Sequence, residues 1–388
     1  MFRRSYKRIF TPLTAMLLIW AAMTPAWCAA PKAAPVEPSV SAKHAVLIDA
    51  ADARVLFARQ AESPAPMAST TKIMSALLLL EAGAPETEVV ATAAMVTMEG
   101  TSMGLRAGDT VSRYALACGM LLSSGNDAAN TTALHLAGST AAFAQRMNAR
   151  AAQIGMEKTR FVTASGLDAD GHRSTALDMA LLGREALQNA AFREICGQAQ
   201  IRVAYGNPPY PRTLRNHNRL VRELEGCIGL KTGFTKMAGR CLVSACTRNG
   251  VTLLAVTLNA PNDWEDHRRL YDYGFARYQS YTLDNPNASF SLPLTGGTQA
   301  TARLIFARPP EVKLPETPKA LRRVVLMRPF EYAPLTKGRV AGTVRYYDGG
   351  ALLAEVPLVV AADYTPKAHA PKKNGLWAKL KAFFHRKK

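Results

Sequence analysis

The order of strand-like and helix-like segments most limits how this 388-residue chain can fold. An apolar run at His44–Asp49, a short turn and Arg54–Phe57 predict an antiparallel hairpin. Helical periodicity then continues for well over a hundred residues, for example in Ser69–Glu81, Arg113–Leu122 and Asn126–Ala137. Early strands followed by a long helical region require later strands to complete the sheet.

Those strands are indicated at Ile228–Thr235, Arg240–Ala245 and Leu253–Leu258. The pattern predicts an α+β domain over residues 31–280, with an antiparallel sheet and a helical cluster. After residue 280, short alternating runs separated by Pro and Gly predict a small β-sandwich-like domain over residues 281–365. Its clearest strand-like runs are Arg323–Leu326, Val340–Tyr346 and Leu352–Val360.

The first 30 residues have the pattern of a secretory signal peptide. Four basic residues precede the largely apolar stretch Leu13–Met23, and small residues follow it. A retained membrane anchor is the alternative, but about eleven apolar residues are too few to span a bilayer. We expect removal of residues 1–30, with cleavage after Cys28 or Ala30, and export of the mature chain.

The formal charge of +19 is concentrated at the two ends of the chain. Residues 1–30 carry four basic residues and no acid, and residues 366–388 carry eight and no acid. Residues 31–280 have a net charge of only about +4, too mild for a polyanion-binding groove. We therefore expect no nucleic-acid partner.

The last 23 residues, 366–388, predict a basic amphipathic helix that lies on a membrane surface. Its apolar residues recur on one face, and most of the basic residues lie off that face. The apolar residues are Leu376, Trp377, Leu380, Phe383 and Phe384. An anionic membrane surface is the expected partner, and a disordered tail or a helix docked on the protein is the alternative.

The mature chain would keep five cysteines after either cleavage, so at least one thiol is unpaired. They are Cys118, Cys196, Cys227, Cys241 and Cys246. The predicted hairpin sets Cys227 roughly opposite Cys246, which leaves open a cross-strand disulfide or buried free thiols. No spacing of Cys, His or carboxylate residues is typical of a metal site, and we expect no metal.

The first chemical motif is Ser69-Thr70-Thr71-Lys72 at the start of a predicted helix. A Ser and a Lys three residues apart lie one turn apart on the same face, so the amine can reach the hydroxyl proton. Alone, the motif is equally explained by a helix-capping Ser and a solvated Lys.

Two further motifs follow in a fixed order: Ser124-Gly125-Asn126 after an apolar helix, and Lys231-Thr232-Gly233 on a predicted strand. The separations are 55 residues from Ser69 to Ser124 and 107 from Ser124 to Lys231. This order is typical of penicillin-recognising serine enzymes.

With these motifs, the mature chain resembles the low-molecular-mass penicillin-binding proteins of the D-alanyl-D-alanine carboxypeptidase type. The resemblance extends to Gly166-Leu167-Asp168 with His172, and to Asn216-His217-Asn218. It implies a serine β-lactamase/transpeptidase-like catalytic domain. The central motif here is Ser-Gly-Asn, where β-lactamases usually have Ser-Asp-Asn.

The chemistry of amide cleavage suggests a role for each motif. Ser69 is the expected nucleophile, and a neutral amine at Lys72 is the expected base. The charge of Lys231 would favour that neutral form. Ser124 is expected to relay a proton to the departing amine, and the resemblance assigns the oxyanion hole to the backbone N–H groups of Ser69 and Phe234.

The remaining motif residues are expected to bind substrate. Lys231 and Thr232 suit a terminal carboxylate, Gly233 permits close backbone approach, and Asn126 can bond an amide carbonyl. The resemblance implies removal of terminal D-alanine from peptidoglycan pentapeptide stems through an acyl-enzyme, without a cofactor, and acylation by β-lactam antibiotics. The mature enzyme is then expected as a peripheral protein on the periplasmic face of the inner (cytoplasmic) membrane.

Other functions remain open from the sequence. A D,D-endopeptidase or transpeptidase acting on crosslinks uses the same motifs, and a non-catalytic penicillin-binding scaffold is an alternative of another class. A β-lactamase is disfavoured because Glu-x-x-Leu-Asn is absent and 155 residues follow Gly233. A Ser-His-Asp triad with His172 is also disfavoured, since Lys72 supplies a base; we expect His172 to fix its loop by hydrogen bonds.

Overall fold

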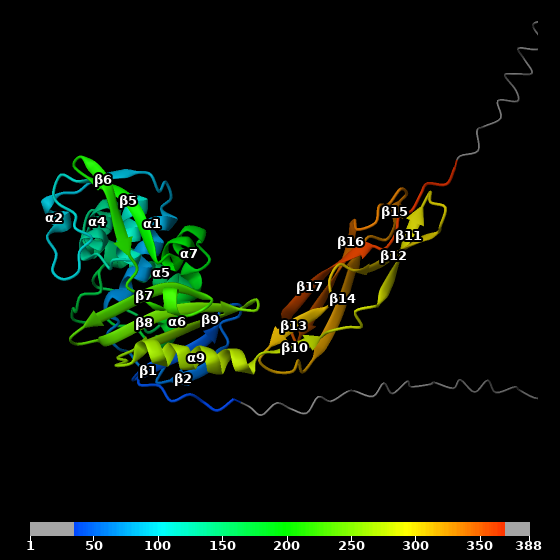
Figure 1. Ribbon diagram of the computed structural model, residues 1–388, viewed down its shortest axis with the longest axis horizontal. Coiled ribbons are helices and arrows are strands. Elements are labelled where there is room, and N and C mark those ends of the chain that lie inside the picture. Colours follow the sequence, from blue (N-terminus) through cyan, green and yellow to red (C-terminus); the bar gives the residue numbers. More distant parts are fainter. Residues whose placement is uncertain (1–34, 369–388) are drawn as a thin grey trace, which may run out of the picture. The chain divides into compact units, whose positions relative to one another are not determined.

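The computed structural model describes residues 35–368, and Figure 1 shows their helices and strands. In this part of the chain, an antiparallel sheet has the strand order β2-β1-β9-β8-β7. Its strands are β1 (His44–Asp49), β2 (Val55–Arg59), β7 (Cys227–Thr235), β8 (Gly239–Arg248) and β9 (Val251–Leu258). The early strands β1 and β2 thus share one sheet with the later strands β7, β8 and β9, as their order in the sequence predicts.

Helices cover both faces of this sheet, and its central strands are therefore buried on both sides. On β1, Val46 and Ile48 belong to the core shared with the helical cluster, whereas Ala45 and Leu47 pack in the core that contains α9 residues. Figure 1 shows α9 across the sheet from α5 and α6. The helices are α1 (Lys72–Glu81), α2 (Ala93–Val96), α3 (Arg113–Leu121), α4 (Asn126–Ala137), α5 (Thr140–Ile154), α6 (Ala176–Ala186), α7 (Ala190–Gly197), α8 (Leu220–Glu223) and α9 (Asp263–Arg277).

A second sheet, in the order β3-β4-β5-β6, interrupts the region that the sequence predicts as helical. Its strands are β3 (Glu88–Val90), β4 (Thr110–Ser112), β5 (Gln200–Gly206) and β6 (Pro209–Arg215). Three-residue strands are too short to show a period of two, and Pro209 and Pro211 obscure β6, since proline normally disfavours a strand.

The last third of the described chain is all β and has an apolar core of its own. One sheet has the order β14-β16-β17-β12-β11-β15, and β10 pairs separately with β13. The strands are β10 (Gln279–Thr282), β11 (Ser289–Thr295), β12 (Thr301–Phe306), β13 (Glu311–Leu314), β14 (Leu321–Met327), β15 (Glu331–Tyr332), β16 (Val340–Asp348) and β17 (Ala351–Val360). The α+β class with an appended β region is confirmed.

Two predicted segments lie outside the described residues. They are the signal segment 1–30 and the apolar face of the interfacial helix, which comprises Leu376, Trp377, Leu380, Phe383 and Phe384. Among the helices within residues 35–368, none combines the length and apolarity needed to cross a membrane.

The predicted juxtaposition of Cys227 and Cys246 is present, because these residues pair across β7 and β8. Of the two alternatives left open by the sequence, the structure has the free thiols and not the disulfide. The pairing register shifts next to Cys227, and the Cys246 thiol donates instead to the Glu225 carbonyl at 3.3 Å. Burial also raises the pKa of Cys227 to about 12, which keeps its thiol protonated.

Candidate active site

Ser69 lies in a tight turn that precedes the first helix. The turn is a 3-10 segment over Ala68–Thr71, and α1 begins only at Lys72, later than the predicted helix start at Ser69. Ala68 has a φ of 48°, so the chain reaches Ser69 through a left-handed residue. Lys72 Nζ and Ser69 Oγ are 2.9 Å apart. The predicted contact between amine and hydroxyl is therefore formed.

The Lys72 amine is fully buried, and in the described chain its hydrogen-bond partners include no carboxylate. Besides Ser69, it donates to Asn126 Oδ1 at 2.7 Å and to the Ser165 carbonyl at 2.6 Å. A neutral amine has two N–H donors and one lone pair. The two pure acceptors can use both donors, and the lone pair is then left for the Ser69 hydroxyl proton.

Electrostatics favours that neutral form. Burial is the main cause that holds the pKa of Lys72 well below its ordinary value, and the positive charge of Lys231 adds to the effect. The negative charge of Asp127 opposes it. Lys72 can therefore act as a base near neutral pH, where an exposed lysine is protonated.

The second motif stands at the start of α4. Ser124 is buried and has a φ of 58°, and it precedes the helix whose first residue is Asn126. Asn126 is held by three contacts: its Oδ1 accepts from Lys72, its Nδ2 donates to the Glu99 carbonyl at 2.6 Å, and its backbone N–H donates to the Thr101 carbonyl at 2.7 Å. These bonds fix the orientation of the side-chain amide.

The third motif lies on β7, the strand at the edge of the catalytic sheet. Lys231 is buried and donates to the Thr232 carbonyl at 2.7 Å. Burial lowers its pKa to about 7. The side chain of Phe234, two residues beyond Thr232, is 66% exposed. The strand thus presents a titratable cation, a hydroxyl and an aromatic ring next to one another in sequence.

Gly233 brings β7 against the turn that carries Ser69. A Cβ on Gly233 would lie 3.0 Å from the Ser69 nitrogen and 3.1 Å from the Thr70 nitrogen. Any larger residue would push the strand away from these two backbone groups. The glycine of the motif therefore permits close packing of β7 on the Ser69 turn, and its part in substrate binding stays a prediction.

Asp127 was not predicted, although it follows Asn126 directly. Its carboxylate accepts from the backbone N–H groups of Met103, Gly104 and Leu105 at 2.9, 3.1 and 3.0 Å, and from Ser102 Oγ at 2.5 Å. It thereby holds the loop whose residues Glu99 and Thr101 bond to Asn126. An acid in the first turn of a helix is favoured by the positive end of that helix, so its position in the sequence does not indicate a bond to another loop. Only the fold shows that residues 102–105 supply the donors.

The opposite side of the same loop is held by the β5–β6 hairpin. Tyr205 donates its hydroxyl to the Met103 carbonyl at 2.6 Å. Arg212 donates to the Gly104 carbonyl at 2.9 Å, and its guanidinium lies 4.2 Å from the centre of the Tyr205 ring. The unpredicted second sheet therefore braces the loop next to the Ser-x-Asn motif.

His172 supports the nucleophile turn indirectly, and its contacts agree with the predicted loop-fixing role. Its Nδ1 accepts from the Val162 backbone N–H at 2.9 Å, so Nε2 carries the proton and donates to Thr71 Oγ1 at 2.9 Å. Thr71 in turn donates to the Ala68 carbonyl at 2.8 Å. Burial lowers the pKa of His172 to about 4, so the ring is neutral at physiological pH.

Gly166, on the same loop as His172, also contacts the nucleophile turn. It has a φ of +84°, and a Cβ there would lie 1.9 Å from the Ala68 carbonyl oxygen. Ser165, which precedes it, supplies the carbonyl that binds Lys72. The Gly-Leu-Asp segment thus packs directly beneath Ser69.

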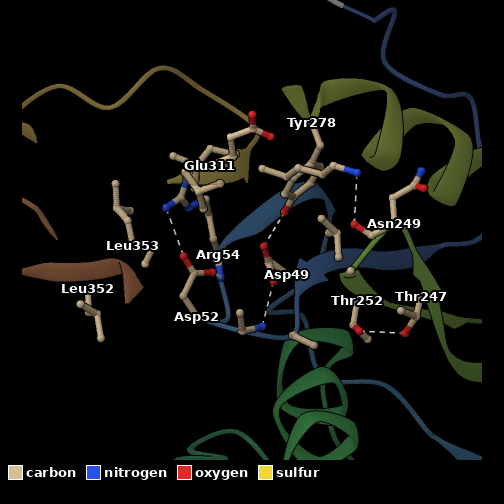
Figure 2. A pocket seen from close by; sticks show the side chains of 18 of the residues that line it. Asp49, Asp52, Arg54, Thr247, Asn249, Thr252, Tyr278, Glu311, Leu352 and Leu353 are labelled. Atoms are coloured by element: carbon tan, nitrogen blue, oxygen red, sulfur yellow. Dashed lines mark hydrogen bonds and ion pairs between the residues drawn. The ribbon is translucent and has the colours of Figure 1, made fainter. Parts of the chain in front are cut away.

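A separate pocket, shown in Figure 2, is lined by none of the three motifs. Tyr278 donates its hydroxyl to Asp49 there, at 2.5 Å. Other residues that line it are Arg54, Thr252 and Glu311. We therefore assign the chemistry to the Ser69 region and not to this pocket.

Comparison with known proteins agrees with this geometry. Residues 31–262 match the family model described as D-alanyl-D-alanine carboxypeptidase. The D-alanyl-D-alanine carboxypeptidase DacC of Escherichia coli (strain K12) is 32% identical over 83% of this chain and 84% of its own length. The D-alanyl-D-alanine endopeptidase of Pseudomonas aeruginosa is 34% identical over 59% of this chain and 75% of its own length.

The same relationship appears among solved structures. A crystal structure of a D-alanyl-D-alanine carboxypeptidase from Mycobacterium tuberculosis H37Rv has a TM-score of 0.60 and 33% identity. It aligns with 63% of this chain and covers 95% of its own. By sequence and by fold, the chain belongs to the D-alanyl-D-alanine carboxypeptidase family of serine peptidases.

Proposed function

We propose that this chain removes the terminal D-alanine from peptidoglycan pentapeptide stems through an acyl-enzyme on Ser69. The observation that carries the proposal is the buried Lys72 amine, which lies 2.9 Å from Ser69 Oγ and has its two other bonds to pure acceptors. A base in this arrangement can take the hydroxyl proton directly.

In acylation, Ser69 Oγ attacks the carbonyl carbon of the penultimate D-alanine while Lys72 takes the hydroxyl proton. The backbone N–H groups of Ser69 and Phe234 stabilise the oxyanion of the tetrahedral intermediate. The C–N bond then breaks, Ser124 relays a proton to the leaving amine, and free D-alanine departs. Water hydrolyses the remaining ester with the same base.

Substrate binding relies on the edge strand and on α4. Lys231 and Thr232 hold the terminal carboxylate, Gly233 permits close approach, and Asn126 bonds an amide carbonyl of the substrate. Because one N–H of the Asn126 amide is bound to Glu99, its other N–H is the donor for substrate. β-Lactams carry an equivalent carboxylate and acyl group, and they would acylate Ser69.

Mass spectrometry of the mature protein after incubation with a penicillin tests the nucleophile. We expect one covalent adduct, absent from Ser69→Ala. An adduct on Ser69→Ala would reject Ser69, and no adduct on the wild type would favour the non-catalytic scaffold. Release of D-alanine from a pentapeptide then tests the reaction itself.

An endopeptidase acting on crosslinks is the second candidate, because the Pseudomonas relative is named a D-alanyl-D-alanine endopeptidase. Both reactions cleave a bond after a D-alanine residue and use one nucleophile. Assay of purified crosslinked and uncrosslinked stem peptides with the same preparation distinguishes them. Faster release of monomers from crosslinked peptides would overturn the carboxypeptidase assignment in favour of the endopeptidase.

The cellular location is also part of the proposal. Residues 1–30 direct export and are removed, the catalytic domain spans 31–280, and the β domain spans 281–365. Residues 366–388 then hold the enzyme on the periplasmic face of the cytoplasmic membrane as a peripheral protein. The support is the charge and periodicity of the two ends of the sequence. Truncation after residue 366 should release the protein from anionic vesicles.

A further inference from the structure

The β region exposes an aromatic pair at the turn between β14 and β15. Phe330 is 44% exposed and Tyr332 is 64% exposed. Their rings meet edge to face with centroids 5.4 Å apart. We call these two residues the aromatic corner. Two adjacent exposed rings place apolar surface at one point of this β region, and exposed apolar surface is a feature of interaction sites.

The surroundings of the aromatic corner are basic. Glu331, between Phe330 and Tyr332 in the sequence, is buried and forms ion pairs with Arg328 at 2.9 Å and Arg339 at 3.4 Å. Both arginines keep exposed side chains, with 72% and 44% of their surface accessible. Lys337 and Lys367 are exposed as well.

Acidic groups near the aromatic corner only partly offset this charge. Asp363, which accepts the backbone N–H of Lys337 at 2.7 Å, is the second acid of this neighbourhood after Glu331. Four basic residues against two acids leave a net positive charge around an apolar centre. This combination suits an anionic surface with an apolar layer beneath it.

The described chain also ends beside the aromatic corner. Tyr332 pairs with Thr295 in β11, and the next residue, Gly296, accepts the backbone N–H of Lys367 at 2.7 Å. Figure 1 shows the red end of the chain leaving next to β11 and β15. Lys367, next to the last described residue, is thus linked through β11 to the corner.

We propose that the aromatic corner is a second membrane-contact surface, which inserts Phe330 and Tyr332 into the headgroup region of an anionic bilayer. The inference rests on the membrane attachment proposed for residues 366–388 and adds a contact that they do not supply. The amphipathic ring of tyrosine favours this depth of a bilayer, and Phe330 adds apolar area that can be buried beside it. Docking of residues 369–388 onto the corner is disfavoured because both segments are positively charged.

A fluorescent label at position 332 provides the most direct test. The full mature chain with Tyr332→Cys, labelled with an environment-sensitive dye, is mixed with phosphatidylcholine vesicles containing 30% phosphatidylglycerol. We expect a blue shift and quenching by spin-labelled lipids. The control is Leu321→Cys, which is 46% exposed at the other end of β14, about 20 Å away, and should stay in water.

Affinity provides an independent measure. We expect Phe330→Ser with Tyr332→Ser to weaken vesicle binding about tenfold, while Leu321→Ser leaves it unchanged. If the doubly substituted chain binds with wild-type affinity and the label at position 332 stays in water, the aromatic corner is rejected as a membrane contact. The terminal attachment is then not affected. A different pair of results would overturn the terminal attachment alone. In that case the doubly substituted chain no longer binds vesicles, whereas a chain that ends at Ala368 still binds them.

Two other outcomes would also decide the matter. If the full mature chain does not bind the vesicles, both proposed membrane contacts are rejected. If the label responds to isolated glycan strands and not to vesicles, the aromatic corner binds sugar and the membrane proposal fails.

Discussion

The catalytic site and the aromatic corner bury ionisable groups in opposite ways. At the site, Lys72 and Lys231 are buried, and neither hydrogen-bonds to a carboxylate in the described chain. At the corner, the buried Glu331 has two arginine partners. Burial without a hydrogen-bonded counter-charge lowers the pKa of a lysine, and the lysine can then act as a base. Burial with counter-charges leaves a stable ion pair, which supports structure but offers no chemistry.

The largest effect expected from this contrast is in Lys72→Arg. A guanidinium stays charged at every accessible pH, so it cannot take the Ser69 proton. We expect the rate of penicillin acylation to fall about a thousandfold, as measured by stopped-flow or mass spectrometry. A variant that keeps a tenth of the wild-type rate would show that the base is another group.

Asp127→Asn should affect both the loop and the base. The amide cannot accept all the bonds that hold residues 102–105, so kcat/KM should fall about tenfold. Asp127 also raises the pKa of Lys72. Removing its charge should therefore lower the pKa of Lys72 and move the acidic limb of the pH profile of the acylation rate to lower pH.

Ser102→Ala is the matched control for Asp127→Asn, since it removes one bond to the carboxylate and no charge. Its acidic limb should coincide with that of the wild type. If both variants shift the acidic limb of the pH profile equally, then movement of the loop, and not the charge of Asp127, controls the pKa of Lys72.

The pH dependence of substrate binding should report the protonation state of Lys231. Its pKa of about 7 makes it cationic below neutral pH and neutral above it. A carboxylate substrate should therefore bind less well as pH rises through 7, with KM increasing several-fold. A pentapeptide amidated at its C-terminus should lack this rise, and an equal rise for both peptides would exclude Lys231 as its origin.

The smallest effect is expected for Glu331→Gln. Its arginine partners are largely exposed, so the free energy of unfolding should fall by about 1 kcal/mol or less, measured by denaturant titration. The rate of penicillin acylation should not change. A slower acylation would mean that the paired, structural region is coupled to the chemistry after all.

Much of the architecture could be predicted from the sequence because it depends on local periodicity. The start of α4 at Asn126 and the strand that carries Lys231 lie where the patterns place them. The sheet β3–β6 could not be predicted, because two of its strands have only three residues. The start of α1 was displaced from Ser69 to Lys72, since Ala68 takes a left-handed conformation that periodicity does not reveal.

The candidate site shows a similar division. The spacing of three motifs predicts Ser69, Ser124 and Lys231 as site residues, and the structure confirms the contact between Lys72 and Ser69. The Ser165 carbonyl that binds Lys72 has no signature, since any residue supplies a carbonyl. Likewise, the loop held by Asp127 is distant in sequence, and only the packed fold shows that the two meet.

The position of β7 at the border of its sheet has a consequence for recognition. Within residues 35–368, the sheet ends at this strand, so no further strand pairs with its outer side. A peptide lying alongside could add itself as a sixth strand and be held largely by main-chain bonds. Such binding tolerates varied side chains, and it would let one enzyme act on stem peptides that differ in composition.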